Sequence, residues 1–167
     1  MKIATPFMLN LVVVTILMAC GGCWTPARPP AAPAPDLDVR ACAENWLDIY
    51  AERRDWGKFL DCYSDKMKFE DQRVRKYLDG RKAFAEFYDW PDERFRLADP
   101  DKPALVVHQL VVEGRTAVAR GRLLPFYWGE ESYDFQDEFV FWVEFDERGK
   151  IVFQRDYIPY PKGLLPD

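Results

Sequence analysis

The sequence predicts an α+β domain in which three N-terminal helices pack on a curved antiparallel sheet. Apolar residues recur at helical spacing in the first half of the domain. In the second half, four long strand candidates follow one another, two pairs of them joined by short polar turns. Helices that precede an antiparallel meander are typical of this class, because each element buries one apolar face against the other layer.

Residues 1–19 are predicted to be an export signal. Phe7–Met18 is mostly apolar and too short for a comfortable membrane span, and Lys2 is the only charge before Arg28. Residues 17–20, with the sequence Leu-Met-Ala-Cys, resemble a lipoprotein cleavage box.

That resemblance implies that Cys20 becomes the lipidated N-terminus of the mature chain, where several acyl chains give stable anchoring. Gly21 stands where an inner-membrane retention signal would have Asp, so we expect an outer-membrane protein, on the periplasmic side or at the cell surface. An uncleaved signal anchor is the alternative, since residues 3–27 carry no charge.

Residues 20–38 are predicted to be a tether. Five prolines alternate with alanines there, and proline favours an extended polyproline II chain. At about 3.1 Å per residue, such a segment would hold the domain roughly 30–45 Å from the bilayer.

The charge balance of the mature chain argues against a nucleic-acid partner. Once Lys2 is removed with the signal, 22 basic residues face 28 acidic ones, a formal charge of −6. Aromatic residues make up 16% of the chain, and they can fill a core or line an apolar pocket.

The expected helices come early. Val39–Arg54 shows a helical apolar stripe, and Asp55 is a plausible N-cap for a second helix that reaches Tyr63. Met67–Asp71 alternates as a short strand, and Arg81–Trp90 is the third helix.

The remainder is predicted to be β-structure. Residues 113–115 and 146–149 are turn sequences. The four strand candidates are Ala104–Val112, Thr116–Trp128, Tyr133–Phe145 and Ile151–Ile158.

These segments together resemble the SnoaL-like, nuclear-transport-factor-2-like superfamily. The resemblance lies in residues 60–65 at the end of the second helix, in Phe69-Glu70-Asp71, in residues 80–84 and in the last hairpin, 146–157, and it extends over residues 39–160. Residues 161–167 would then be a C-terminal tail. The resemblance implies a cone with a pocket at its wide end, as in ketosteroid isomerases, polyketide cyclases, dehydratases and non-catalytic binding modules.

Three aspartates are candidate catalytic residues. Asp137 is predicted on the inner face of its strand by its parity with Phe135 and Phe139, and Asp71 shares a face with Phe69. The resemblance makes Asp71 the counterpart of the isomerase general base, and it directs Asp156 toward the pocket. Carboxylates that share an apolar pocket repel, so at least one stays protonated and can act as an acid.

A structural role is the alternative for each aspartate. Asp71 would cap a turn or pair with a nearby arginine, Asp156 would pair with a strand arginine, and Asp137 would be solvated at the rim. Isomerase chemistry also needs two oxyanion donors, and their positions fall on Leu47 and Phe141, neither of which can donate.

The expected pocket is aromatic and would receive a small apolar or amphipathic ligand, with no cofactor and no metal. The single histidine, His108, and the scattered acids lack metal-ligand spacing, so we interpret His108 as structural. The residues predicted to contact the ligand are Tyr50, Tyr63, Phe69, Phe87, Trp90, Phe139, Phe141 and Gln154.

Cys42 and Cys62 are the two cysteines of the domain. Export favours a disulfide between them, whereas their unequal distances from the turn between the helices oppose it, and the sequence leaves the question open. The outer sheet face, with Arg120, Val140 and Trp142, is a candidate homodimer surface.

Three functions are consistent with these patterns. The first is ligand binding without turnover. The second is acid–base catalysis of the cyclase, isomerase or dehydratase type with Asp71 as base. The third is an envelope interaction module that uses the outer sheet face.

Overall fold

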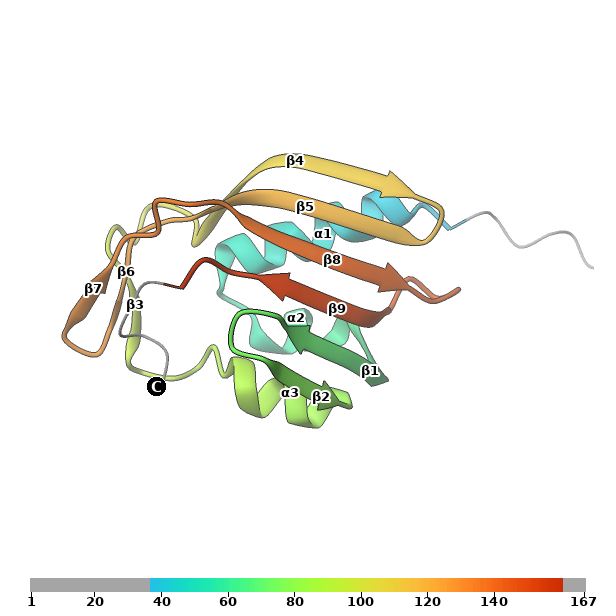
Figure 1. Ribbon diagram of the computed structural model, residues 1–167, viewed down its shortest axis with the longest axis horizontal. Helices are drawn as coiled ribbons and strands as arrows, with labels where there is room; N and C mark the ends of the chain where they lie inside the picture. Colours follow the sequence, from blue (N-terminus) through green and yellow to red (C-terminus); the bar gives the residue numbers. More distant parts are fainter. Residues whose placement is uncertain (1–36, 161–167) are drawn as a thin grey trace, which may run out of the picture. The chain divides into compact units, whose positions relative to one another are not determined.

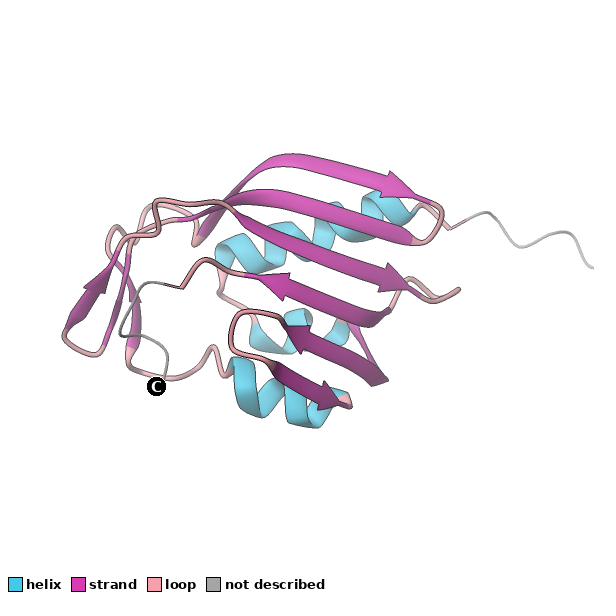
Figure 2. Cartoon of the chain, in the orientation of Figure 1, coloured by secondary structure: helices cyan, strands magenta, loops and turns pink. Residues whose placement is uncertain are grey.

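The computed structural model describes residues 37–160, which form a mixed six-stranded sheet with three helices against one face and a small three-stranded sheet at one end (Figures 1 and 2). The strand orders are β2-β1-β9-β8-β5-β4 and β3-β6-β7. The helices are α1 (Val39–Glu52), α2 (Trp56–Asp61) and α3 (Arg81–Tyr88). The strands are β1 (Tyr63–Asp71), β2 (Lys76–Asp79), β3 (Phe95–Leu97), β4 (Leu105–Glu113), β5 (Thr116–Leu123), β6 (Phe126–Trp128), β7 (Glu131–Tyr133), β8 (Phe139–Phe145) and β9 (Ile151–Tyr157).

Asp38 and Asp55 are the N-cap residues of the first two helices. An N-cap side chain accepts a hydrogen bond from a free backbone N–H group in the first turn of its helix. Asp38 accepts from the amide of Ala41 at 3.0 Å, and Asp55 accepts from the amide of Lys58 at 2.9 Å. The second helix is shorter than predicted, because Tyr63 already belongs to β1. Cys20, the predicted lipidation site, lies outside the described residues, as do the predicted signal and residues 20–36 of the predicted tether.

The expectation of an antiparallel sheet preceded by three helices is wrong in two respects. Strand β9 lies between β8 and β1, and it pairs parallel with β1. Helix α3 follows the β1–β2 hairpin instead of preceding the sheet, and it packs on those two strands, whereas α1 packs on β4 and β5. The class remains α+β with a curved mixed sheet.

Two predicted strands are each interrupted. Pro125 has no N–H group for a strand ladder, and the segment Thr116–Trp128 divides there into β5 and β6. The segment Tyr133–Phe145 divides at the loop of residues 134–138. As a result, Phe126 and Trp128 belong to the small sheet and not to the outer face of the large one.

The interior is a stack of aromatic rings from the helices and the sheet. The Tyr50 ring lies 5.5 Å from Phe141 and 5.1 Å from Trp90, and Phe59 stacks on Trp90 at 3.8 Å. Offset and edge-to-face pairs of this kind add to the stability that burial provides. The aromatic residues that the sequence offered as pocket lining are therefore mostly core.

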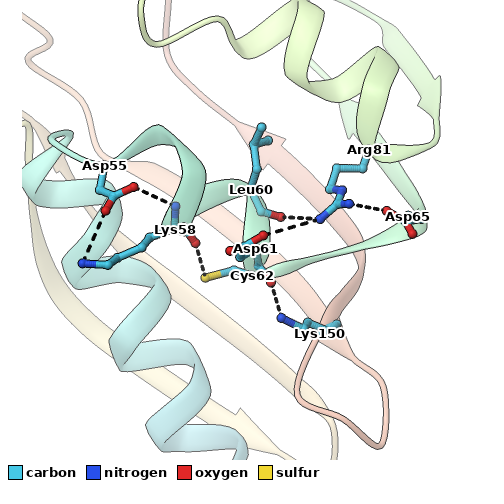
Figure 3. A network of polar contacts seen from close by, with 8 residues as sticks. All are labelled: Asp55, Lys58, Leu60, Asp61, Cys62, Asp65, Arg81 and Lys150. Carbon is cyan, nitrogen blue, oxygen red and sulfur yellow. Dashed lines mark hydrogen bonds and ion pairs between the residues drawn. The ribbon is translucent and has the colours of Figure 1, made fainter.

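The junction of α2 and β1 is held by polar contacts to two other parts of the chain (Figure 3). Arg81, the first residue of α3, pairs with Asp65 and donates to the carbonyl of Leu60 at 3.4 Å. Lys150, in the β8–β9 turn, donates to the carbonyl of Asp61. These contacts attach both the start of α3 and the β8–β9 turn to the α2–β1 junction.

The outer sheet face carries apolar side chains beside charged ones. Trp142 is 40% exposed and lies opposite Val118, and Tyr157 lies opposite Val140. His108 sits where the β4–β5 register shifts, and its Nδ1 is 2.6 Å from the Glu138 carboxylate. The homodimer through this face stays a prediction.

Position 121 requires glycine, because the backbone of β4 lies very close to it where the β4–β5 register shifts. A Cβ there would lie 2.0 Å from the Val106 carbonyl oxygen and 2.9 Å from the Phe139 ring. We expect Gly121→Ala to lower the free energy of unfolding by roughly 3 kcal/mol, at the upper end of overpacking costs. Urea unfolding measures this change.

Gly114→Ala is the matched control. Gly114 has φ +56°, and no atom lies within 4 Å of the place that an alanine methyl group would take, so the cost is backbone strain alone, about 1–2 kcal/mol. Equal losses in the two variants would contradict the steric account of Gly121.

Candidate functional site

A cleft of about 700 Å³ opens beside the carboxyl ends of β1 and β9. Parallel strands end at the same edge of a sheet, so the residues that follow β1 and the residues that end β9 meet there. The loop between β7 and β8 supplies the remaining wall. The lining residues are Gln72, Arg73, Asp134, Phe135, Gln136, Asp137, Tyr157, Ile158, Pro159 and Tyr160.

Asp71 lies directly behind this cleft and is fully buried. One of its carboxylate oxygens accepts from the amides of Arg73 at 2.9 Å and Val74 at 3.2 Å. The other accepts from the Tyr160 hydroxyl at 2.7 Å. Asp71 thus caps the turn after β1, and Tyr160 stands between the cleft and this carboxylate.

Asp156 is paired with Asp71 in the β1–β9 register and is also fully buried. The Tyr88 hydroxyl donates to one of its oxygens, and Gln154 Nε2 donates to the other at 2.8 Å. The two aspartates therefore differ in access to the cleft, because only the Asp71 carboxylate is hydrogen-bonded to residues that line it.

A chain of buried hydrogen bonds continues from Gln154 into the helices. The Tyr63 hydroxyl donates to Gln154 Oε1 at 2.7 Å, and Trp46 Nε1 donates to the Tyr63 oxygen at 2.8 Å. On the other side, the Tyr50 hydroxyl lies 3.4 Å from that of Tyr88. A connected network of this type orients each member, since every buried polar group has a partner.

Burial is the main influence on the pKa values in this network. It raises the pKa of Asp156 from an ordinary 3.8 to about 7, with a further increase from the charge of Asp71, against the lowering effect of hydrogen bonds from Tyr88 and Gln154. Burial likewise raises the pKa of Tyr63 and Tyr88. Asp156 can therefore hold or release a proton near neutral pH, whereas the tyrosines remain neutral donors.

Three of the predicted ligand-contact residues belong to this network: Tyr50, Tyr63 and Gln154. Phe69, Phe139 and Phe141 are buried to 1% exposure or less, and Trp90 to 7%, within the aromatic core. The structure therefore brings Asp71 and Asp156 together with Gln154, as predicted, but in a filled interior.

Two predicted site residues lie elsewhere. Asp137 is exposed at the rim of the cleft, and its predicted position on the inner strand face is wrong because the chain leaves the sheet before β8 begins. Phe87 is 38% exposed on the outer side of α3, where its ring meets Phe69 at 5.5 Å and the Lys76 ammonium at 5.7 Å.

Tyr88 and Tyr160 are the polar residues that the sequence did not mark as site residues. Tyr88 lies on the apolar stripe of the predicted third helix, which is a signal for an inward position but not for a hydrogen bond to Asp156. Tyr160 follows the last strand by three residues, and no periodic pattern extends to it.

Cys42 and Cys62 are free thiols in the structure, so the disulfide left open by the sequence is not formed. Both line a second cleft of about 280 Å³, and Cys62 contacts the Lys58 carbonyl at 3.4 Å (Figure 3). Burial raises the pKa of Cys62 to about 11, which keeps it protonated at neutral pH. Within residues 37–160, no three histidine, cysteine or acidic side chains are grouped as metal ligands.

The sequence profile of the SnoaL-like domain family matches residues 43–154, and the chain belongs to this family. No curated protein matches the sequence. The matched residues include Asp71, Tyr63, Tyr88 and Gln154, and Asp156 and Tyr160 follow them along the chain.

Solved structures agree on the fold. An NTF2-like protein of Anabaena variabilis is similar at a TM-score of 0.58 and 14% identity, over 74% of this chain and 90% of that one. An LEH-like epoxide hydrolase of M. tuberculosis is similar at a TM-score of 0.56 and 16% identity, over 72% and 81%. A candidate SnoaL-like polyketide cyclase of Shewanella putrefaciens is similar at a TM-score of 0.57 and 13% identity, over 74% and 81%.

The raised pKa of Asp156 predicts a specific pH dependence of stability. Because the folded-state pKa lies above the unfolded one, the protonated carboxyl stabilises the fold fully below about pH 4, and this contribution is lost as the pH rises to about 7. Asp156→Asn keeps donor and acceptor atoms but removes the titration. Relative to wild type, the variant should gain stability between pH 4 and pH 8 by on the order of 4 kcal/mol.

Urea unfolding at several pH values measures this difference. Asp137→Asn removes a carboxylate at an exposed position and serves as the control, with no such gain expected. Parallel pH profiles for wild type and Asp156→Asn would show that Asp156 is ionised in the folded protein throughout this range.

Proposed function

We propose that this SnoaL-like domain binds a small apolar or amphipathic molecule in the 700 Å³ cleft, and that a lipid on Cys20 tethers it to the outer membrane. The observation that supports this proposal is the cleft itself. It has the volume of a small-molecule site, apolar walls from Phe135, Ile158 and Pro159, and a polar inner end where Tyr160 meets Asp71.

One hydrogen-bond donor of the ligand is expected at the inner end of the cleft. Tyr160 has its hydroxyl on a buried carboxylate, so its oxygen keeps a lone pair for one donor from a ligand. Gln72 and Gln136 add amide groups at the mouth. A molecule with an apolar body and few polar groups matches this lining.

The anchoring part of the proposal rests on the signal and tether sequences, 1–19 and 20–38. Among residues 37–160, no helix is long and apolar enough to cross a bilayer. Attachment through Cys20 accounts for a membrane location with the domain held away from the lipid, on the periplasmic side or at the surface.

Filling the mouth of the cleft tests the binding site. Gln136 is exposed and lines the cleft, so Gln136→Trp places an indole in it without disturbing the core. We expect the affinity for the neutral probe N-phenyl-1-naphthylamine to fall at least about ten-fold, a loss of about 1.4 kcal/mol. Fluorescence titration measures it, and native mass spectrometry of protein purified from the periplasm shows any retained natural ligand.

Gln109→Trp is the matched control, because Gln109 is an exposed glutamine on β4, away from the cleft lining. It should leave the affinity unchanged. If both tryptophan variants bind the probe as wild type does, or if wild type does not bind it, the cleft is not a ligand site.

Lipidation has its own test. Cys20→Ser removes the only thiol that the cleavage box offers, so the full-length variant should lose incorporation of radiolabelled palmitate, which wild type shows. Incorporation that persists in the variant would contradict lipidation at Cys20.

Acid–base catalysis is the second candidate, because Asp156 combines a pKa near 7 with a hydrogen-bonded tyrosine. Such a pair suits isomerase, cyclase or dehydratase chemistry on a ligand that reaches it past Tyr160. Turnover of the retained compound that Asp156→Asn abolishes, with binding preserved, would establish an enzyme.

A further inference from the structure

Arg53 is a half-buried cation at the aromatic end of the domain, and it has no acidic partner in the described part of the chain. Its guanidinium carbon lies 3.6 Å from the centre of the Phe95 ring and 5.0 Å from that of Trp90. Among residues 37–160, no carboxylate forms an ion pair with it and no acceptor forms a hydrogen bond with its side chain. A guanidinium has five donors, and burial of a charge is costly unless the charge is paired.

Burial lowers the pKa of Arg53, and the groups that influence it most after burial are the hydroxyls of Tyr50 and Tyr88. Both hydroxyls belong to the network that ends on Asp156. Arg53 lies over the Trp90 ring, and the centre of that ring is 5.1 Å from the centre of the Tyr50 ring, so one aromatic side chain separates Arg53 from the network.

A second unpaired donor lies beside Arg53. Trp90 is 7% exposed, and its indole Nε1 is buried with no hydrogen-bond partner in the described part of the chain. Buried donors are nearly always paired, so a buried donor without a partner indicates a group that is supplied from outside. An acceptor-rich ligand group would suit both donors.

The backbone is strained at this place. Arg53 has φ 46° at the end of α1, and Asp89, which precedes Trp90, has φ 27° at the end of α3. Residues other than glycine rarely adopt positive φ, and such strain is concentrated at binding and catalytic sites. Both helices thus end in a conformation that presents Arg53 and Trp90 to each other.

An aromatic row connects Arg53 to the cleft. Phe95 meets Phe126 at 5.1 Å, Phe126 meets Phe135 at 5.6 Å, and Phe135 meets Tyr160 at 6.3 Å between ring centres. Phe135 and Tyr160 are cleft residues. The row joins two cleft residues to the ring that the guanidinium covers, and a ligand can reach the rings between them because Phe95 and Phe126 are only half-buried.

We propose that the ligand is a long amphipathic organic acid, whose apolar body lies along this aromatic row and whose carboxylate binds Arg53. The proposal rests on the ligand-binding function proposed above, and it names the ligand's chemical class. Arginine holds a carboxylate through two parallel hydrogen bonds, which fixes the orientation of the acid. The ring faces of Phe95 and Trp90 hold the guanidinium in place before the acid arrives.

The test uses two probes that differ in charge only, dansyl-aminoundecanoic acid and its methyl ester. The protein is the unlipidated mature chain, residues 21–167, whose described part belongs to one compact unit. We expect wild type to bind the acid at least ten-fold more tightly than the ester. Arg53→Gln should lose this preference while its affinity for the ester is unchanged, and Arg53→Lys should retain part of it.

Arg54→Gln is the control, since Arg54 is the exposed neighbour and its loss changes the net charge equally. It should keep the preference for the acid. Retained ester binding by Arg53→Gln also shows that this variant is folded.

The outcomes are distinguishable. If wild type binds acid and ester equally, the proposal for Arg53 is overturned while the cleft remains a ligand site. If the acid preference survives in Arg53→Gln and is lost in Arg73→Gln, the acid binds at the cleft mouth and the proposal is overturned. If neither probe binds wild type, both the proposal and the binding function fail.

Discussion

The parallel pairing of β1 with β9 is the constraint on which the rest of the site depends. It joins the first and last long strands of the domain and places Asp71 and Asp156 on adjacent strands in register. Because parallel strands end at one edge, the residues after both strands also meet, and they form the cleft. The carboxylates, their partners and the cleft therefore all follow from one ladder of hydrogen bonds.

The two aspartates occupy different environments although they are neighbours. Asp71 accepts two backbone amides and the Tyr160 hydroxyl, whereas Asp156 accepts from two side-chain donors in an apolar interior, and burial raises the pKa of Asp156 to about 7. Asp156 can therefore hold a proton near neutral pH. Whether a ligand reaches this carboxyl decides between the binding and the catalytic proposals, because the fold alone fixes neither function.

Much of the fold could be predicted from sequence because its signals are local. Helical spacing located α1, the N-cap residue Asp55 located α2, and turn residues located the last hairpin. The parallel β1–β9 pairing could not be predicted, since it depends on contacts between segments about 85 residues apart. Pro125 did signal a break in the strand, but a long alternating pattern on both sides concealed it.

The candidate site was predictable only in part. Asp71 was found because a polar residue on an apolar strand face is conspicuous, whereas Asp156 and Gln154 were found through the resemblance to the SnoaL-like superfamily. Asp137 was misplaced, because strand parity does not apply where the chain leaves the sheet. Tyr88 and Tyr160 could not be assigned partners, and Arg53 looked like an ordinary helix-end cation, because their roles depend on which rings and carboxyls surround them in the folded domain.

The position of β9 also has a consequence for how the protein is made. This strand lies between β8 and β1, so the large sheet stays divided until nearly the whole chain is available. Sheets that depend on such distant pairing fold slowly, and the chain exposes unpaired strand edges meanwhile. The large sheet of such a chain stays incomplete until its last residues are synthesised, which is compatible with the export that we propose.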